Sequence, residues 1–314
     1  MGRILVAGGA GFIGSHLCDA LLERGDTVLA VDNFISGRPE NISHLRTHER
    51  FGFIEADICR PFVPRGPFDA VLNFASPASP ADFDRIPLEI LAVGSTGTRQ
   101  LLDIAVQHDA RFFLASTSEV YGDPLVHPQP ESYWGNVDPI GPRSCYDEAK
   151  RFSEALTMAY QRAHGVDIRI ARIFNTYGPR MRPHDGRVVT NLVVQALRGE
   201  PLTLYGTGEQ TRSFCYVDDE VSGLLALLEG DITGPCNIGN PTEFTMRELA
   251  EMVLDITGST SNIVCLPMPS ARVGDPLQRR PDLTLARSAL GFEPTVPLRD
   301  GLEQMIKHLA NELT

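Results

Sequence analysis

The sequence has no long hydrophobic run, no Cys-x-x-Cys pair and no excess of positive charge. No apolar stretch approaches the roughly 20 residues that cross a bilayer, so a membrane-spanning protein is not expected. The 314 residues carry 28 basic and 40 acidic side chains, a net charge of -12 that disfavours nucleic acid and anionic membranes as partners. Scattered cysteines and the lack of a basic, apolar leader predict a cytoplasmic protein with reduced thiols.

A metal site is also not expected, because the eight histidines form no convincing ligand set. His44 and His48 are four residues apart, but this spacing is more typical of a solvated helix face than of a metal site.

Short β-rich segments alternate with helical patterns in the first half of the chain. Near-continuous apolar strands joined by helical crossovers predict an α/β protein with a doubly wound parallel sheet, a Rossmann fold. We expect a Rossmann domain over residues 1–175, with about 213–235 returning to it, and a smaller, partly discontinuous C-terminal substrate-binding lobe over 176–314. The expected strands are 3–7, 27–31, 51–55, 70–74, 111–115 and 167–171, and the expected helices are 12–24, 95–108, 145–164, 218–228, 246–257 and 298–313.

A glycine-rich turn, Gly-Gly-Ala-Gly-Phe-Ile-Gly at 8–14, separates the first strand from the first helix. Backbone N–H groups at such a helix start would face a pyrophosphate, and glycine allows the close approach. Asp32 closes the second strand, where its carboxylate can accept hydrogen bonds from a ribose diol and repel a 2′-phosphate, so NAD is expected rather than NADP. Arg38 is either a surface charge or a group that tolerates the phosphate.

Asp57 follows the third strand, where it either meets the adenine or caps the strand end. The expected cofactor contacts are Gly8, Gly11, Phe12, Ile13, Gly14, Asp32, Asn33, Ser36, Gly37, Asp57, Ile58, Phe74, Ala75, Ser76, Tyr146 and Lys150.

Tyr146 and Lys150 have the spacing Tyr-x-x-x-Lys. Positions four apart on a helix share a face, so the lysine ammonium can favour the phenolate over the phenol, whose pKa is ordinarily about 10. The pair alone would more often be a core-edge aromatic and a solvated lysine. Downstream of a nucleotide-binding turn and of Thr117-Ser118-Glu119, it predicts hydride transfer with Tyr146 as the base.

These motifs resemble those of the extended short-chain dehydrogenase/reductases, and most closely the UDP-glucuronate decarboxylases that make UDP-xylose. The Ser-Pro-Ala-Ser-Pro run at 76–80 and the stretch 114–150 are the most specific parts of the resemblance. The resemblance covers nearly the whole chain, and its matching segments are 8–17, 31–34, 75–80, 114–124, 136–143, 172–181 and 185–189.

The resemblance implies that UDP-glucuronate is oxidised at C4 by NAD, loses carbon dioxide as a β-keto acid and is reduced again to UDP-xylose. Thr117 and the Tyr146 hydroxyl would stabilise the enolate. Glu119 would lie beside C5 and C6, where it could position the sugar or move a proton, unless it is a structural acid bonded to nearby backbone. The catalytic residues that the resemblance implies are Tyr146, Lys150, Thr117, Glu119, Ser118 and Arg279.

Ser118 takes the place where the related dehydratases carry aspartate, which argues against elimination of water. Arg279 could stabilise the enolate or fix the carboxylate. The acidic chain also gathers arginines that could hold a diphosphate: Arg180, Arg182, Arg187, Arg212, Arg272, Arg279 and Arg280.

By resemblance, Asn175 and Arg212 contact the diphosphate, Val188 and Tyr205 pack on the uracil, and Arg187 helps to close the pocket. The expected substrate contacts are Asn175, Arg180, Arg187, Val188, Tyr205, Arg212 and Arg279.

The chain departs from the decarboxylase pattern at Ala92-Val93-Gly94, where relatives usually read Lys-Thr-Asn. The family places this lysine near the sugar, and the asparagine commonly braces the catalytic helix or its water. Oxidation should survive these losses, but a looser hold on the intermediate could release UDP-4-keto-pentose and leave NADH bound.

Two other functions stay open at this point. A UDP-sugar 4-epimerase would share the cofactor and the Tyr-Lys pair but would have little use for Glu119. A non-catalytic NAD-sensing Rossmann protein would not be expected to keep Thr117, Tyr146 and Lys150 together. By resemblance, the helices near 95–108 and 145–164 would form a four-helix bundle across a two-fold axis, so a homodimer is expected.

Overall fold

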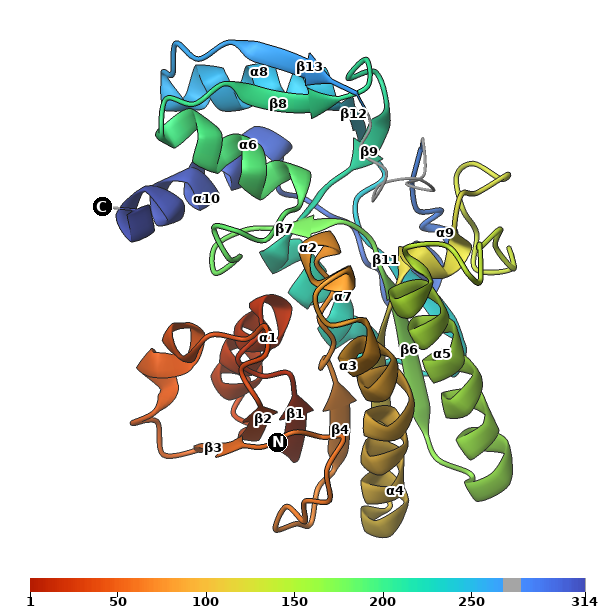
Figure 1. Cartoon of the computed structure of the whole chain (residues 1–314). Coiled ribbons are helices and arrows are strands. Elements are labelled where there is room, and N and C mark those ends of the chain that lie inside the picture. The colour runs from red at the N-terminus through yellow and green to blue at the C-terminus, as the bar shows by residue number, and fades with distance from the viewer. Residues whose placement is uncertain (268–277, 314) are drawn as a thin grey trace.

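Seven parallel strands form the central sheet, in the order β11-β6-β5-β4-β1-β2-β3 (Figure 1). The computed structural model describes residues 1–267 and 278–313. The predicted doubly wound fold is confirmed, and each of the six expected strands is present with its ends shifted by two residues at most. The strands are β1 (Arg3–Ala7), β2 (Thr27–Asp32), β3 (Phe51–Glu55), β4 (Ala70–Asn73), β5 (Arg111–Thr117), β6 (Ile168–Ile173) and β11 (Pro235–Ile238).

Two hydrophobic clusters cover the two faces of the sheet. Alternate residues of a strand point to opposite faces, so Ile4 and Val6 join one cluster while Leu5 and Ala7 join the other. The first cluster includes α1 (Phe12–Glu23) and α7 (Val217–Glu229), which contact each other. The second includes α4 (Thr98–His108), and α5 (Ser144–His164) packs against the same side.

The segment that leads into α4 is less regular than its sequence suggested. After β4 the chain forms α2 (Pro80–Phe83) and α3 (Pro87–Ala92), followed by the π-helical turn η2 (Val93–Gly97). The helix expected at 95–108 therefore begins as a π-turn. The 3₁₀ turns η1 (Pro39–Leu45) and η3 (Ser118–Tyr121) follow β2 and β5.

A small lobe lies beyond the carboxyl ends of the strands (Figure 1). The apolar face of α8 packs on α6 and α10, and the predicted helices at 246–257 and 298–313 are confirmed. A capping box between Thr245 and Glu248 starts α8, and Gly258 with φ 64° ends it. The lobe comprises α6 (Val188–Leu197), β8 (Leu202–Tyr205), β9 (Thr211–Ser213), β12 (Glu243–Thr245), α8 (Met246–Thr257), β13 (Ile263–Leu266) and α10 (Leu298–Leu313).

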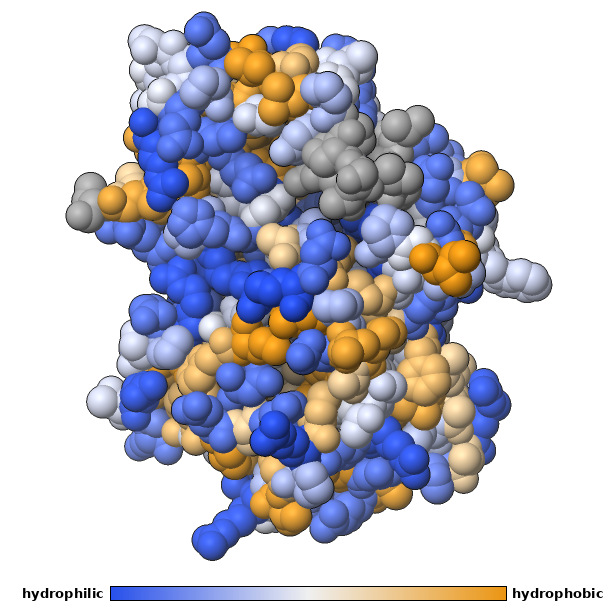
Figure 2. All heavy atoms as spheres, viewed as in Figure 1, coloured by the Kyte–Doolittle hydropathy of each residue, from blue (hydrophilic) through white to orange (hydrophobic). Residues whose placement is uncertain are grey.

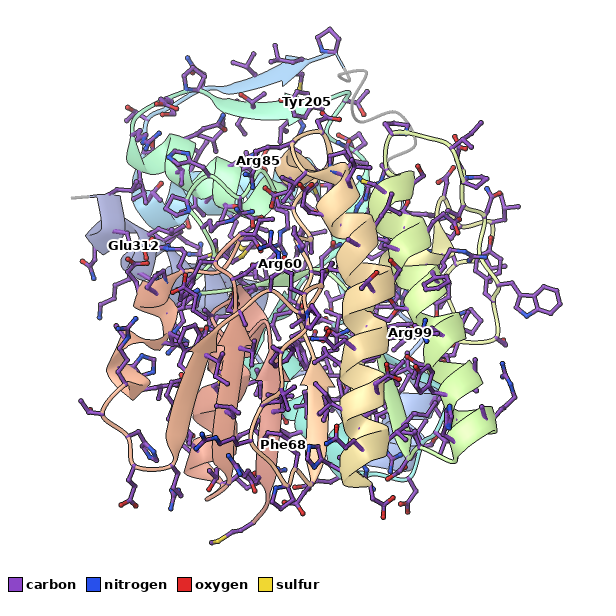
Figure 3. The ribbon with its side chains drawn as sticks, turned by 60° about the horizontal axis from the view of Figure 1, so that its bottom comes forward. Arg60, Phe68, Arg85, Arg99, Tyr205 and Glu312 are labelled. Carbon is purple, nitrogen blue, oxygen red and sulfur yellow. The ribbon has the colours of Figure 1, made fainter. Side chains whose placement is uncertain are left out.

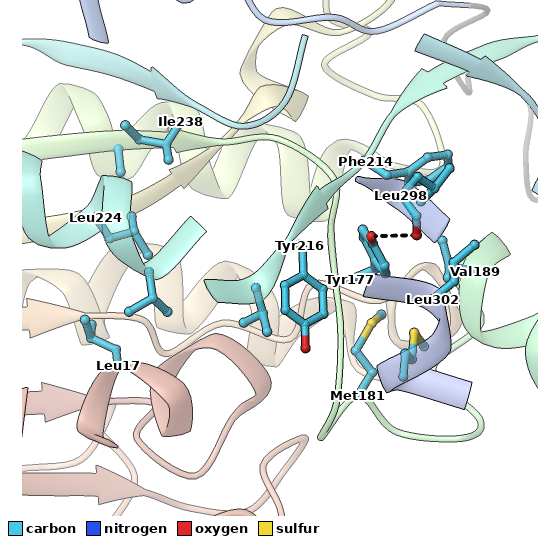
Figure 4. Packing of buried hydrophobic residues seen from close by; sticks show 14 of the residues in the cluster. Leu17, Tyr177, Met181, Val189, Phe214, Tyr216, Leu224, Ile238, Leu298 and Leu302 are labelled. Carbon is cyan, nitrogen blue, oxygen red and sulfur yellow. Dashed lines mark hydrogen bonds between the residues drawn. The ribbon is translucent and has the colours of Figure 1, made fainter. Parts of the chain in front are cut away.

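The first hydrophobic cluster continues from the sheet into the small lobe (Figure 4). Leu17 of α1 and Leu224 of α7 share it with Val189 of α6 and Leu302 of α10. The Tyr177 hydroxyl, from the short strand β7 (Thr176–Tyr177), donates to the Leu298 carbonyl at 3.1 Å. β7 pairs with β10 (Cys215–Tyr216), which leads directly into α7.

The chain passes between the sheet and the small lobe more than once. β11 pairs with β6 at the edge of the sheet, and α9 (Thr284–Leu290) contacts both β11 and α7. The division into a cofactor-binding domain over 1–175, with 213–235 returning, and a substrate-binding lobe over 176–314 is a functional assignment and stays a prediction.

Candidate active site

A cavity of about 860 Å³ lies between the carboxyl ends of the strands and the small lobe. This is the edge at which ligands bind in open α/β sheets. On one face of the molecule, hydrophilic residues gather along the waist between the two parts, next to a hydrophobic patch (Figure 2). The cavity lining takes residues from the ends of β1, β2, β4 and β5, from the start of α5, and from α6 and β8.

The glycine turn lines the end of this cavity at β1 and α1. Gly8 has φ +79°, and a Cβ there would lie 2.5 Å from the Phe74 carbonyl carbon. A Cβ at Gly14 would overlap the Gly8 carbonyl. The N-cap residue of α1, Gly11, has no side-chain cap, so the helix presents backbone N–H groups where an anion can approach.

Asp32 lies at this end of the cavity, as the sequence predicted. Its carboxylate accepts hydrogen bonds from Ala10 N at 3.0 Å and from Phe34 N at 2.8 Å. Burial raises the pKa of Asp32, and these backbone bonds oppose the rise. Of the expected cofactor contacts, Gly37 alone is not in the lining; a Cβ on it would lie 2.7 Å from both Asp32 carboxylate oxygens, so it packs behind Asp32 instead.

Arg38 and Asp57 were each left with two interpretations. The Arg38 guanidinium pairs with Glu312 of α10 at 3.0 Å and does not line the cavity. The first interpretation of Arg38, a charge outside the cofactor site, therefore fits the structure. Asp57 lines the cavity, and its Oδ1 also accepts a hydrogen bond from Cys59 N at 2.9 Å, so the loop after β3 is held by the same side chain that faces the cavity.

Tyr146 and Lys150 lie together on the first turns of α5, both buried. The Lys150 ammonium is 5.8 Å from the Tyr146 ring centroid and donates to the Ala115 carbonyl at 2.8 Å. Burial lowers the pKa of Lys150 to about 8. Burial raises the pKa of Tyr146, whereas a side-chain hydrogen bond with Thr117 lowers it. Tyr146 therefore needs a further positive charge nearby before it can lose its proton at neutral pH.

Glu119 is held by two arginines. Its carboxylate accepts hydrogen bonds from Arg279 at 2.6 and 2.7 Å and forms an ion pair with Arg143 at 2.7 Å. Burial alone would raise the pKa of Glu119, but the two guanidinium charges outweigh burial and hold the pKa at about 2. Glu119 is thus a permanent carboxylate bonded to arginine side chains rather than to nearby backbone.

Arg143 was missed by the sequence reasoning. It is buried, lines the cavity, and lies 5.5 Å from the centroid of the Phe83 ring, which stacks on Tyr146 at 5.2 Å. The only signal was its place three residues before Tyr146, inside a segment that resembles the decarboxylases. Ser118 is buried and lines the same end of the cavity.

Most of the arginines expected to hold a diphosphate pair with carboxylates in this structure, and their role at the diphosphate stays a prediction. Arg272 lies outside the described residues. Arg212 lines the cavity and donates to the Thr211 carbonyl at 2.8 Å. The ion pairs are Arg180 with Asp19 at 2.6 Å, Arg182 with Asp82 at 2.6 Å, Arg187 with Asp185 at 2.5 Å, Arg279 with Glu119 at 2.6 Å and Arg280 with Glu243 at 3.8 Å.

The remaining expected substrate contacts line the cavity on its small-lobe side. They are Asn175 after β6, Val188 at the start of α6, and Tyr205 at the end of β8 (Figure 3). Within residues 1–267 and 278–313, no group of three or more His, Cys, Asp or Glu side chains could hold a metal ion. The helices in that part of the chain are too short or too polar to span a membrane.

The chain matches a family model for the NAD dependent epimerase/dehydratase family over residues 4–239. UDP-glucuronic acid decarboxylase 5 of Arabidopsis thaliana is 53% identical over 304 residues, which cover 96% of this chain and 88% of the relative. UDP-glucuronic acid decarboxylase 1 of Danio rerio is 49% identical over 311 residues, 99% of this chain and 73% of the relative.

Solved structures of the same fold carry the cofactor expected from the sequence. A UDP-glucuronic acid 4-epimerase from Bacillus cereus, in complex with UDP-glucuronic acid and NAD, is 32% identical with a TM-score of 0.87 and covers 99% of this chain and 100% of its own. A dTDP-glucose 4,6-dehydratase from Streptomyces venezuelae with NAD bound is 29% identical with a TM-score of 0.87, covering 98% and 97%. The chain belongs to the NAD dependent epimerase/dehydratase family and, within it, to the UDP-glucuronic acid decarboxylases.

Proposed function

We propose that this protein decarboxylates UDP-glucuronate to UDP-xylose, using NAD that is restored within each turnover. The observation that carries the proposal is the group formed by Tyr146, Thr117 and the Glu119 carboxylate between two buried arginines, at the end of a cavity shaped for a dinucleotide. At about 50% identity over nearly the whole chain, the decarboxylases support this choice of reaction.

The end of the cavity at β1 and α1 fits NAD. The turn at Gly8 and Gly14 leaves room for a pyrophosphate where any Cβ would clash, and the Gly11 end of α1 faces the same space. Asp32 would accept hydrogen bonds from a ribose diol, and Lys150 would lie near the second ribose and Tyr146. When bound, NAD accepts a hydride from C4 of the sugar and returns it at the end of the cycle.

Tyr146 removes the proton from the sugar 4-hydroxyl, and the Thr117 hydroxyl holds the same oxygen. The 4-keto sugar that results is a β-keto acid, because its carboxylate is attached to the carbon next to the ketone. The bond to the carboxylate breaks, carbon dioxide leaves, and the electron pair stays as an enolate between C5 and the C4 oxygen, where Thr117 and Tyr146 donate hydrogen bonds. A proton then adds at C5, which leaves a 4-keto pentose whose C4 would accept the hydride that bound NAD supplies.

We assign Glu119 to positioning Arg279 and to supplying a fixed negative charge, rather than to proton transfer. A carboxylate with a pKa of about 2 cannot supply the C5 proton at neutral pH. It holds Arg279 at the reacting end of the sugar, and its own charge disfavours the substrate carboxylate before carbon dioxide leaves. The Arg279 Nε is buried with no hydrogen-bond partner among the described residues, so this guanidinium still has a donor to offer.

The UDP part of the substrate would occupy the small-lobe side of the cavity, and this assignment rests on the proposed division of the chain at about residue 175. Val188 and Tyr205 would pack on the uracil, while Asn175 and Arg212 would contact the diphosphate. Arg180 and Arg187 would exchange carboxylate partners for phosphate or close the pocket over it.

Incubation of the purified protein with UDP-glucuronate and NAD tests the proposal, with carbon dioxide, sugar nucleotides and NADH measured together. Carbon dioxide and UDP-xylose without net NADH are the expected result. UDP-4-keto-pentose with NADH would mean that the departure at Ala92-Val93-Gly94 lets the intermediate escape. UDP-galacturonate without carbon dioxide would favour the 4-epimerase, and binding of NAD without any reaction would favour an NAD sensor.

We also propose a cytoplasmic homodimer in which α4 and α5 pair across a two-fold axis. Large apolar side chains are exposed on these two helices, namely Val106 of α4 at 40% and Phe152 of α5 at 49%. All six cysteines are free, which suits a compartment that keeps thiols reduced. Sedimentation of the wild type and of Phe152→Glu tests the dimer, since a charge in a paired helix face should shift the protein toward the monomer.

A further inference from the structure

A chain of buried polar groups connects the catalytic helix to its neighbours. Asn73 Nδ2, at the end of β4, donates to Thr98 Oγ1 at 3.1 Å. Thr98 Oγ1 lies 3.4 Å from Ser153 Oγ on α5, and Ser153 Oγ donates to the Gly94 carbonyl at 2.7 Å. The three side chains are between 1% and 3% exposed, so these groups satisfy one another without solvent.

Two of these hydroxyls bond to carbonyls of the π-turn η2. A π-turn shifts the hydrogen-bonding register of a helix, and carbonyls at the shift lack their usual partner. Two successive carbonyls of η2 receive side-chain donors: Thr98 Oγ1 bonds Val93 O at 3.2 Å and Ser153 Oγ bonds Gly94 O. The Val93 carbonyl also accepts the Thr98 backbone N–H, so the Thr98 hydroxyl adds to that bond, whereas Ser153 brings a donor from α5 to the Gly94 carbonyl.

The same turn crosses α5 at very short range. A Cβ on Gly94 would lie 2.7 Å from the Ala149 Cβ and 2.9 Å from the Ala149 carbonyl oxygen. Such close packing fixes the distance between η2 and α5. Ser153 adds a polar contact between α5 and η2 at this crossing, beside the bonds that Lys150 and Glu154 make to β5 and β6.

Ser153 lies on the catalytic face of α5. It is three residues after Lys150 and seven after Tyr146, so the three side chains share one stripe of the helix. At the other end of the chain of groups, Asn73 Oδ1 accepts from Ala75 N at 3.2 Å, in the loop that lines the cofactor cavity. These buried polar groups therefore lie between the cofactor loop and the helix that carries Tyr146 and Lys150, with η2 bonded from both sides by Thr98 and Ser153.

We propose that Ser153 is a positioning residue for the reaction. Its hydroxyl anchors α5 to η2 and so sets where Tyr146 and Lys150 stand relative to the cofactor. The inference rests on the proposed function, because it assigns Tyr146 and Lys150 to hydride transfer and cofactor binding.

The competing explanation is a purely local bond. Ser153 Oγ also lies 2.8 Å from the Ala149 carbonyl one turn earlier, which is an ordinary contact for serine within a helix. A hydroxyl has one proton, so it serves only one of the two carbonyls at a time. Thr157, one turn further along α5, is 0% exposed and donates to the Ser153 carbonyl at 2.8 Å, with no hydrogen bond to η2 among the described residues.

Thr157 therefore supplies the matched control. Ser153→Ala and Thr157→Val each remove one buried hydroxyl from the same helix. We expect Ser153→Ala to lower kcat by about 10- to 100-fold, as small misplacements of reacting groups do, with KM for UDP-glucuronate nearly unchanged. We also expect the pH at which kcat reaches half its maximum to move, because the distance between Lys150 and Tyr146 changes. Thr157→Val should alter neither quantity.

Binding of NAD, followed by fluorescence or calorimetry, keeps the test independent of turnover. Ser153→Ala should weaken NAD binding by about tenfold relative to Thr157→Val, because Lys150 moves with α5. Equal kcat, pH profile and NAD affinity in the two variants would overturn the proposal. If the wild type releases no carbon dioxide, the proposed function fails, and NAD affinity alone then decides the role of Ser153.

Discussion

Replacing Glu119 with glutamine tests the central ionic group of the active site. Glu119→Gln keeps the shape of the side chain but removes the charge that Arg143 and Arg279 share. Both guanidinium groups are buried, with side chains 9% and 4% exposed, so solvent cannot substitute for the lost carboxylate. The arginines would remain as two close positive charges with one amide between them.

The size of the effect follows from the pKa of Glu119. The folded protein holds it at about 2 against an ordinary 4.5, a difference that corresponds to roughly 3 kcal/mol at neutral pH. Removal of one partner from other buried ion pairs costs about 3 to 5 kcal/mol. Because the folded pKa is depressed, the contribution is fully present above pH 4.5 and is lost as pH falls toward 2.

Urea unfolding at pH 7 and at pH 3.5 measures this difference, alongside carbon dioxide release. We expect Glu119→Gln to be less stable than the wild type by roughly 3 kcal/mol at pH 7, with a smaller gap at pH 3.5. Carbon dioxide release should fall by about 100-fold or more, as when a buried charge at a reacting centre is lost.

Asp167 offers a control, because it too lies between two arginines, Arg111 at 2.6 Å and Arg169 at 2.5 Å. Its side chain is 45% exposed and does not line the cavity, so Asp167→Asn should cost less stability and leave activity unchanged. A Glu119→Gln protein as stable as the wild type at pH 7, or a stability gap that does not change with pH, would refute the reasoning.

Three further predictions concern packing, cofactor choice and pH. Gly94→Asn should destabilise the protein by about 1 to 3 kcal/mol, because its Cβ would lie 2.7 Å from that of Ala149; thermal melting should show partial recovery when Ala149→Gly is added. Asp32→Ser should improve NADP binding relative to NAD, since the carboxylate that repels a 2′-phosphate is gone. Fluorescence titration with both cofactors measures the ratio of the two affinities. An unchanged ratio would mean that Asp32 does not select NAD over NADP. The pKa of Lys150 is about 8 in the folded protein against 10.5 ordinarily, so between these pH values the folded protein binds fewer protons than the unfolded chain. The stability of the wild type relative to Lys150→Met should therefore rise from pH 8 to pH 10.5. A stability difference that stays constant in thermal melts across this pH range would contradict the prediction.

Most of the fold could be predicted because its signals are local. Short, near-continuous apolar runs located every expected strand, and the glycine turn before α1 is a short-range signal for a βα unit. The exception was the segment before α4, where helical periodicity cannot distinguish a π-turn from an α-helix. The distinction depends on Ser153 and on the close crossing at Ala149, both distant in sequence.

The candidate site was predicted less completely, because its charges interact across the fold. Glu119, Arg143 and Arg279 come from three separate segments, and no spacing rule places one carboxylate between these two arginines. The sequence allowed us to predict which arginines gather around the substrate site. It could not show that Asp19 and Asp82 already neutralise some of them.

The neutralised arginines have a kinetic consequence. Long-range attraction depends on net charge, and this chain carries -12 while its proposed substrate is itself a polyanion. A guanidinium group paired with a carboxylate produces little electric field outside the cavity. The negatively charged substrate therefore approaches against the repulsion of the negatively charged protein. It is attracted by the arginines only after it has displaced their carboxylate partners. Added salt, which slows capture by enzymes that steer their ligands electrostatically, should speed association here until it begins to weaken the contacts inside the cavity.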